Sequence, residues 1–267
     1  MSNDAPRRDI LKSGALAFGA PAVLSALQAT KAIKVGLVGC GGRGSGAAAQ
    51  ALKADDFSNL TAMADVFQER IDDSVARLER IHKDKVKVEK ANMYVGLDAY
   101  KKLIDSDIDV VLLATPPGFR PEQLRYAIEK GKHVFCEKPM ALSAPLAAEM
   151  TREARTRGLV GVIAFIFRHT YCMQEVRRLV RAGAIGQPHY VSIDSQGQSW
   201  HRATDATWRT YSGIHGAGQL GEMGSHLFDA INFTVGPTEG FISEVAAVTH
   251  TVARMVAGPD GQPIPVE

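Results

Sequence analysis

The sequence has few cysteines, little excess charge and no long apolar run. Its three cysteines, Cys40, Cys136 and Cys172, are odd in number and far apart, which argues against a disulfide framework and a thiolate metal site. The formal net charge is only +2, with acidic and basic residues interspersed, so we expect no nucleic-acid partner. Hydrophobic residues make up 45% of the 267 residues, enough to bury a core for one large domain or two modest ones.

The N-terminus differs in character from the rest of the chain. Arg7 and Arg8 precede a weakly apolar stretch over residues 14–27, a pattern typical of a twin-arginine export signal. This stretch is shorter than the about 20 strongly apolar residues of a membrane span, and Pro21 interrupts it. We therefore expect residues 1–30 to be a signal, no stable membrane span, and a periplasmic or extracytoplasmic location. A flexible tail or a lone amphipathic helix is the alternative.

From Lys34 onward, short β-branched runs alternate with longer helical patterns. This alternation is typical of a parallel sheet covered by helices on both faces. Strands are predicted at 34–39, 60–65, 110–115, 133–136 and 159–165, with a weaker one at 93–94. Helices are predicted at 45–53, 68–82, 121–130 and 144–157. The sequence thus predicts an α/β protein with an N-terminal doubly wound sheet of the Rossmann type over residues 31–165.

The alternation stops after Phe165. One helix is predicted at 173–181, then a polar strand at 189–194, and an apparent strand at 241–253 lies close to the end of the chain. We expect residues 166–267 to form a second, incomplete domain and the chain to be truncated at its C-terminus.

A glycine motif joins the first predicted strand to the helix that follows it. Six consecutive residues fit the pattern G-x-G-x-x-G: Gly39, Cys40, Gly41, Gly42, Arg43 and Gly44. Glycine permits a sharp turn and a close approach of the backbone to a pyrophosphate, and the helix N-terminus supplies N–H donors. The strand before it and the helix after it make dinucleotide binding the favoured interpretation.

Asp65 ends the second predicted strand, where a carboxylate can accept hydrogen bonds from a ribose diol. It would repel a 2′-phosphate, which favours NAD over NADP. Arg70 could serve a phosphate if the loop folds back, so NADP stays an alternative. A helix-capping role for Asp65 is compatible with both cofactors.

Two proline-containing segments follow later strands, at the sheet edge where ligands bind in open α/β folds. Thr115, Pro116 and Pro117 follow one strand, and Glu137, Lys138 and Pro139 follow the next. This order predicts Thr115, Pro116 and Glu137 at the cofactor and Lys138 beside the nicotinamide. The alternative for Lys138 is an ordinary surface lysine.

The last constellation opens an apolar helical run over residues 221–233. Helical spacing puts Glu222 and His226 on one face, with Asp229 close to it. We expect His226 in the first turn, where the helix dipole disfavours the imidazolium and keeps the ring able to accept a proton. A hydrogen-bonded structural histidine is the alternative, and a metal site lacks the paired histidines of a helical zinc motif.

Together, the glycine loop, Asp65, the Glu137-Lys138-Pro139 segment and the segment around His226 resemble the glucose-fructose oxidoreductase/inositol dehydrogenase/MocA family. The resemblance covers about residues 31–236. It implies a Rossmann domain followed by an α/β domain whose mostly antiparallel sheet often forms an oligomer interface, hence a homo-oligomer if that domain is complete. It also implies that Lys138 contacts the reacting hydroxyl and His226 accepts its proton. Glu222 stands where many dehydrogenases of this family carry aspartate.

The main hypothesis is therefore hydride transfer between a nicotinamide and a secondary hydroxyl of a sugar or cyclitol. Lys138, His226 and Glu222 are the candidate catalytic residues, and Arg168, Trp200, Trp208 and Asp229 are candidates for substrate binding. Because the twin-arginine route moves folded proteins to a compartment poor in nicotinamides, we expect a tightly bound cofactor. The alternatives are an NAD-dependent lyase or hydrolase that uses transient oxidation, and a non-catalytic sugar- or dinucleotide-binding protein.

Overall fold

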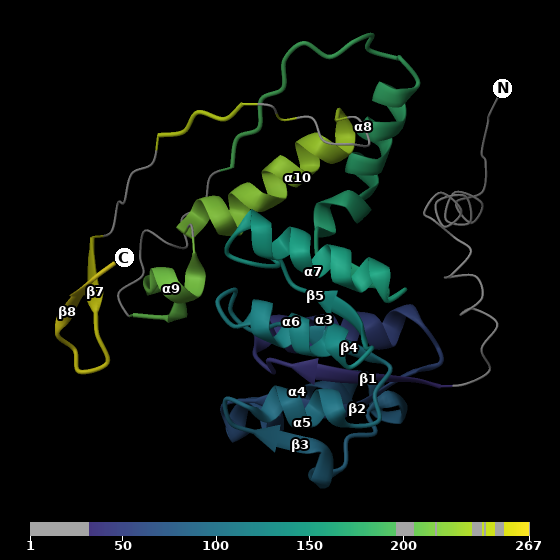
Figure 1. Ribbon diagram of the computed structural model, residues 1–267, viewed down its shortest axis with the longest axis vertical. Coiled ribbons are helices and arrows are strands. Elements are labelled where there is room, and N and C mark those ends of the chain that lie inside the picture. Colours follow the sequence, from purple (N-terminus) through teal and green to yellow (C-terminus); the bar gives the residue numbers. More distant parts are fainter. Residues whose placement is uncertain are drawn as a thin grey trace.

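The computed structural model describes residues 32–195, 206–216, 218–236, 242, 244–248 and 254–266 (Figure 1). The predicted export signal over residues 1–30, the candidate substrate residue Trp200 and much of the predicted strand at 241–253 lie outside these residues. Among the described helices, none combines the length and the apolar character needed to cross a membrane.

A parallel sheet of six strands forms the centre of the N-terminal part. Its strands are β1 (Ile33–Val38), β2 (Ser58–Asp65), β3 (Met93–Val95), β4 (Val110–Leu113), β5 (His133–Cys136) and β6 (Gly161–Ile163). They lie in the order β3-β2-β1-β4-β5-β6, so the order reverses between β1 and β4. In such sheets a ligand crevice opens beyond the carboxyl ends of the strands at this reversal.

Helices cover both faces of the sheet. They are α3 (Gly42–Ala54), α4 (Gln68–His82), α5 (Ala99–Asp105), α6 (Arg120–Glu129) and α7 (Ala144–Thr156), with the short 3-10 turns η1 (Lys83–Lys85) and η2 (Lys90–Asn92). Leu52 and Leu78 pack with Leu37 in one buried cluster, which belongs to α3, α4 and one face of β1. Leu103 and Ile128 belong to the other cluster, with α5, α6 and α7 on the opposite face. The doubly wound α/β fold predicted from the sequence is confirmed.

The C-terminal part packs two helices side by side (Figure 1). They are α8 (Tyr171–Arg181), which follows the 3-10 turn η3 (Ile166–His169), and α10 (Ser225–Thr234). Between them in sequence lie the 3-10 turn η4 (Trp208–Thr210), the short helix α9 (Ser212–His215) and a π-helical turn, η5 (Leu220–Gly224). Two antiparallel strands, β7 (Met255–Ala257) and β8 (Pro263–Pro265), complete the described part.

Helix α9 joins the C-terminal part to the Rossmann sheet. The backbone N–H of Gly118, in the loop after β4, donates to the carbonyl of Ile214 at 2.8 Å. A Cβ at Gly118 would lie 2.7 Å from the carbonyl oxygen of Gly213, so only glycine permits this close approach. The contact places the segment over residues 208–216 at the carboxyl edge of the sheet.

The element boundaries agree closely with the sequence-based expectations in the N-terminal part and less closely after Phe165. Helix α4 and strand β5 have the predicted bounds, whereas α5 was not predicted. The predicted strand at 189–194 was wrong, because these residues have no regular secondary structure and pair with no described strand, and Tyr190 is 85% exposed. The described residues at 242 and 244–248 are not in a strand either, and the antiparallel pairing begins at Met255.

Candidate active site

A cavity of about 780 Å³ opens at the carboxyl edge of the parallel sheet. Its volume falls within the range of about 300–1,000 Å³ that is usual for small-molecule sites. The Rossmann part contributes the glycine loop and the ends of β2, β4 and β5, and the C-terminal part contributes Trp208, Arg209, His215, Glu222 and His226. All nine predicted cofactor-binding residues line it: Gly39, Gly41, Gly42, Arg43, Gly44, Asp65, Thr115, Pro116 and Glu137.

The glycine loop passes close to the sheet and leaves its outer side open. Gly39 has a φ of +90°, and Gly44 lies so close that a Cβ there would be 1.8 Å from the carbonyl oxygen of Gly39. Gly41 and Gly42 have no heavy atom within 4 Å of an added Cβ, and α3 begins at Gly42. The loop thus presents bare backbone at a helix N-terminus, which fits a pyrophosphate.

Asp65 connects the end of β2 to this loop. Its Oδ2 accepts a hydrogen bond from the backbone N–H of Cys40 at 2.6 Å, and its Oδ1 accepts one from Phe67 at 3.1 Å. The carboxylate is therefore held beside the glycine loop and lines the cavity, where it fits a ribose diol. Arg70 also lines the cavity.

Arg43 and Glu137 form an ion pair across the cavity wall. Arg43 Nε donates to Glu137 Oε1 at 2.5 Å, which links the glycine loop to the segment after β5. The Glu137 side chain is 7% exposed and the Arg43 side chain 43% exposed. The pair therefore fixes a buried carboxylate while the guanidinium stays accessible from the cavity.

Arg120 holds the two proline-containing segments together, and no motif in the sequence marks this residue. Its Nε donates to the carbonyl of Thr115 at 2.7 Å, and its Nη1 donates to the carbonyls of Glu137 at 3.0 Å and Pro139 at 2.6 Å. Burial lowers the pKa of Arg120, although nearby Cys136, Glu137 and Glu222 oppose that shift. A charged donor at the first position of α6 thus positions the strand ends that flank Lys138.

Lys138 points towards the C-terminal part of the chain. Its Nζ donates to the backbone carbonyl of Glu222 at 2.5 Å, and the peptide bond to Pro139 is cis. Burial lowers the pKa of Lys138, opposed by the negative charges of Glu222 and Glu137. The side chain lines the cavity, so an ammonium with further N–H donors stands at the end of β5.

His226 lines the same cavity and is 7% exposed. Its ring packs on Phe167 with centroids 4.8 Å apart, and its Nδ1 has no hydrogen-bond partner within the described residues. Burial, followed by the positive charge of Lys138, lowers its pKa below the ordinary value of 6.5. A neutral ring at the wall of the cavity is suited to accept a proton.

His226 is the second residue of α10, as expected for a place in its first turn, but that turn is not the start of the helical segment. Residues 218–219 are already helical, and the π-helical turn η5 runs without a break into α10. His226 therefore lies well inside a longer helix, away from its positive end. Burial among aromatic rings, rather than the helix dipole, favours the neutral ring.

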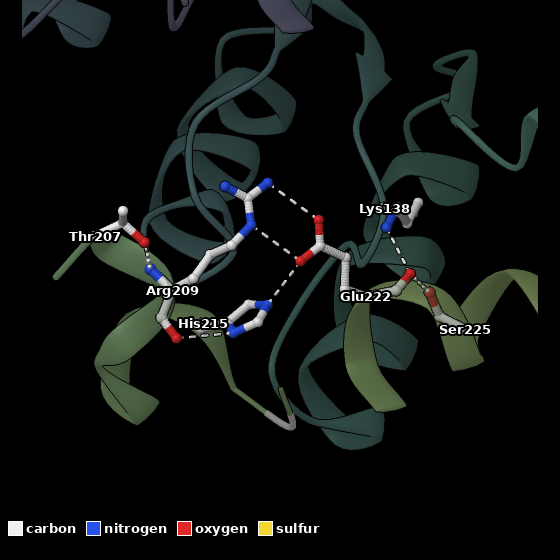
Figure 2. A network of polar contacts seen from close by, with 6 residues as sticks. All are labelled: Lys138, Thr207, Arg209, His215, Glu222 and Ser225. Atoms are coloured by element: carbon white, nitrogen blue, oxygen red, sulfur yellow. Dashed lines mark hydrogen bonds and ion pairs between the residues drawn. The ribbon is translucent and has the colours of Figure 1, made fainter. Parts of the chain in front are cut away.

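Glu222 lies in a polar network that the sequence did not indicate (Figure 2). Arg209 donates through Nε and Nη2 to the two carboxylate oxygens at 3.0 and 3.1 Å, and His215 Nε2 lies 3.1 Å from Oε2. Burial would raise the pKa of Glu222, but the hydrogen bonds and charge of Arg209, with Lys138 and His215, lower it on balance. Neither Arg209 nor His215 has a sequence spacing that relates it to Glu222.

The structure places only some of the predicted substrate-binding residues at the cavity. Trp208 lines the cavity, and Arg209 lies over its ring at 4.1 Å. Arg168 and Asp229 instead pair with each other, with Arg168 Nε 2.8 Å from Asp229 Oδ2, and neither is among the described residues that line the cavity. This pair ties η3 to α10. Within the described part, no group of three His, Cys, Asp or Glu side chains could hold a metal ion.

Two family models match this chain. Residues 33–165 match that of the "Oxidoreductase family, NAD-binding Rossmann fold", and residues 173–263 match that of the "GFO/IDH/MocA C-terminal domain". The first match contains the glycine loop, Asp65 and Lys138, and the second contains Glu222 and His226.

Several characterised proteins are similar to this chain. Levoglucosan dehydrogenase from Pseudarthrobacter phenanthrenivorans is 32% identical over 152 residues, which are 55% of this chain and 37% of that enzyme. Myo-inositol 2-dehydrogenase from Thermotoga maritima is 29% identical over 164 residues, 61% of this chain and 45% of that enzyme. The chain thus matches less than half the length of these two relatives. A structure of levoglucosan dehydrogenase in complex with NADH and L-sorbose has a TM-score of 0.72 at 25% identity, covering 88% of this chain and 61% of that one.

Proposed function

Because the chain belongs to the GFO/IDH/MocA family of oxidoreductases, we propose that it transfers a hydride between NAD and a secondary hydroxyl of a sugar or cyclitol. The observation that carries the proposal is the meeting of three features at one cavity: the glycine loop, the Lys138 ammonium and the neutral His226 ring. Each comes from a different part of the chain, and the fold brings them together.

The bound nicotinamide supplies the hydride acceptor or donor, and the chain's own residues handle the proton and the orientation. Lys138 Nζ keeps N–H donors beyond its bond to the Glu222 carbonyl, so it can donate to a substrate hydroxyl and lower the cost of its deprotonation. His226, neutral and buried, accepts that proton. In the reverse direction His226 returns the proton to the carbonyl oxygen, and Lys138 donates a hydrogen bond to that oxygen.

The relatives and the cavity both support the proposed substrate class. The relatives are named for levoglucosan and myo-inositol, both of which carry several secondary hydroxyls. Trp208 lines the cavity with an aromatic surface, and Glu222 and Arg209 line it with polar groups that suit a polyol. We propose that the substrate of this chain is a sugar or cyclitol similar in size to levoglucosan or myo-inositol. We also propose that the whole protein assembles from several copies.

We also propose that NAD is tightly held and that the protein works outside the cytoplasm. The twin-arginine pattern of residues 1–30 supports this, because folded export would carry the nucleotide along. Protein purified from the periplasm should then contain NAD that is released only on denaturation. Recovery of nucleotide-free protein that binds NAD weakly would contradict this part of the proposal.

His226→Ala tests the catalytic proposal. General-base catalysis contributes about 10²–10⁴-fold, so we expect kcat to fall by that factor while NAD still binds. NADH absorbance would be followed with levoglucosan, myo-inositol and D-glucosides. His82→Ala, at the end of α4, is the matched control and should keep wild-type turnover. A His226→Ala variant with full turnover on the substrate of the wild type would refute the role of this residue.

A further inference from the structure

His215 stands between two hydrogen-bond acceptors. Its Nδ1 lies 3.1 Å from the backbone carbonyl oxygen of Arg209, and its Nε2 lies 3.1 Å from Glu222 Oε2 (Figure 2). The residue is 7% exposed, and the Trp208 ring covers it edge-on at 5.3 Å between centroids. Both ring nitrogens are therefore committed to these two oxygens.

A neutral imidazole cannot satisfy this arrangement. It carries one N–H, so either neutral tautomer turns a nitrogen lone pair towards an oxygen lone pair at 3.1 Å. A backbone carbonyl cannot donate. Glu222 is an anion here, because Arg209 donates to both of its carboxylate oxygens and the pKa of Glu222 is lowered. Only the imidazolium, with a hydrogen on each nitrogen, donates to both partners.

The backbone carbonyl of Glu222 contacts Lys138. The carbonyl oxygen of Glu222 accepts from Lys138 Nζ at 2.5 Å and from Ser225 Oγ at 3.1 Å. This carbonyl lies in the π-helical turn η5, and such turns are frequent at functional sites. Fixing the Glu222 side chain therefore fixes the carbonyl that holds the Lys138 ammonium.

We propose that His215 is an imidazolium and that, together with Arg209, it holds the Glu222 carboxylate in place. Through the backbone of Glu222 it thereby positions Lys138. This positioning role rests on the function proposed above. Glu222 then holds Lys138 in position and does not accept the proton, which goes to His226. Among the described residues, the charged or titratable groups around Glu222 and His215 are Arg209 from η4, Lys138 after β5, Arg120 from α6 and His226 from α10.

Nitrogen NMR on the nucleotide-free full chain tests the charge state directly. In protein labelled with ¹⁵N-histidine, the His215 signals are those missing from a His215→Gln spectrum. At neutral pH we expect the wild type to show both ring nitrogens protonated. In Glu222→Gln the new amide can donate to Nε2, so His215 should become neutral with its hydrogen on Nδ1 alone. A neutral His215 in the wild type, or no change in Glu222→Gln, would overturn the proposal.

Turnover tests the positioning role. A misplacement of about 1 Å at a reacting group can cost about 10²-fold, so His215→Gln should lower kcat per NAD-binding site by about ten- to a hundredfold. The Kd for NAD should stay at the wild-type value, because the glycine loop is untouched. An unchanged kcat would refute the positioning role. If the wild type itself oxidises no sugar or cyclitol, the proposed function fails, while the nitrogen signals still decide the state of His215.

Discussion

The contact between Gly44 and Gly39 gives the sharpest test of how the glycine loop works. A Cβ on Gly44 would lie 1.8 Å from the Gly39 carbonyl oxygen, 3.0 Å from its carbon and 3.3 Å from the Ala114 Cβ. Real Cβ atoms stay at least 3.0 Å from such atoms, so Gly44→Ala must separate α3 from the end of β1 by about 1.2 Å. The obstacle is backbone, which no rotamer change can remove.

The expected loss of stability in Gly44→Ala follows from the movement of α3 away from β1. Overpacking of this kind costs about 1–3 kcal/mol, and Ala48 and Leu52 on the same helix would lose part of their packing on β1. The helix N-terminus would leave the position that the pyrophosphate needs. Loss of about 1.4 kcal/mol of that interaction lowers affinity tenfold, so we expect at least about a tenfold rise in the Kd for NAD.

Gly46→Ala is the matched control, because the same change is made half a turn along the same helix. An added Cβ there meets only Arg43 Nη1, at 3.9 Å. Alanine is the better helix former, so we expect this variant to be more stable than the wild type by about 0.5–1 kcal/mol. Urea denaturation gives the stability, and titration calorimetry gives the Kd for NAD. Equal stability and equal NAD affinity in the two variants would refute the reasoning.

Two further predictions concern pH and the choice of cofactor. Because burial lowers the pKa of His226 below 6.5, kcat/KM for alcohol oxidation should hold its plateau down to about that pH and fall as pH drops through the lowered pKa. As the pH falls, the His226 side chain of the unfolded chain binds a proton before that of the folded chain, so folding stability should also decline below pH 6.5. A midpoint of the activity profile above pH 6.5 would contradict the role of His226 as proton acceptor. Asp65→Asn removes the carboxylate charge at the expected ribose position, so the ratio of Kd for NADP to Kd for NAD should fall by about tenfold or more. An unchanged ratio would show that Asp65 does not discriminate between the cofactors.

The amino-acid sequence determined the N-terminal fold and the cofactor end of the site. Strong local signals carried this result: β-branched runs for the strands, longer helical patterns between them, and the pattern from Gly39 to Gly44 at a strand–helix junction. Asp65 and Lys138 could be placed because each directly follows a strand, and all parallel strands end at the same edge of the sheet. These predictions depend on neighbours in the sequence and on one topological rule.

Tertiary structure alone decided the C-terminal half of the site. Arg120 and His215 act through contacts with backbone carbonyls and with a side chain from another element, and no spacing in the sequence marks such partners. The π-helical turn η5 precedes α10 directly, and burial by Phe167 took over the role expected of the helix dipole at His226. Burial and long-range hydrogen bonds depend on which segments meet in space, and that is settled only when the whole chain folds.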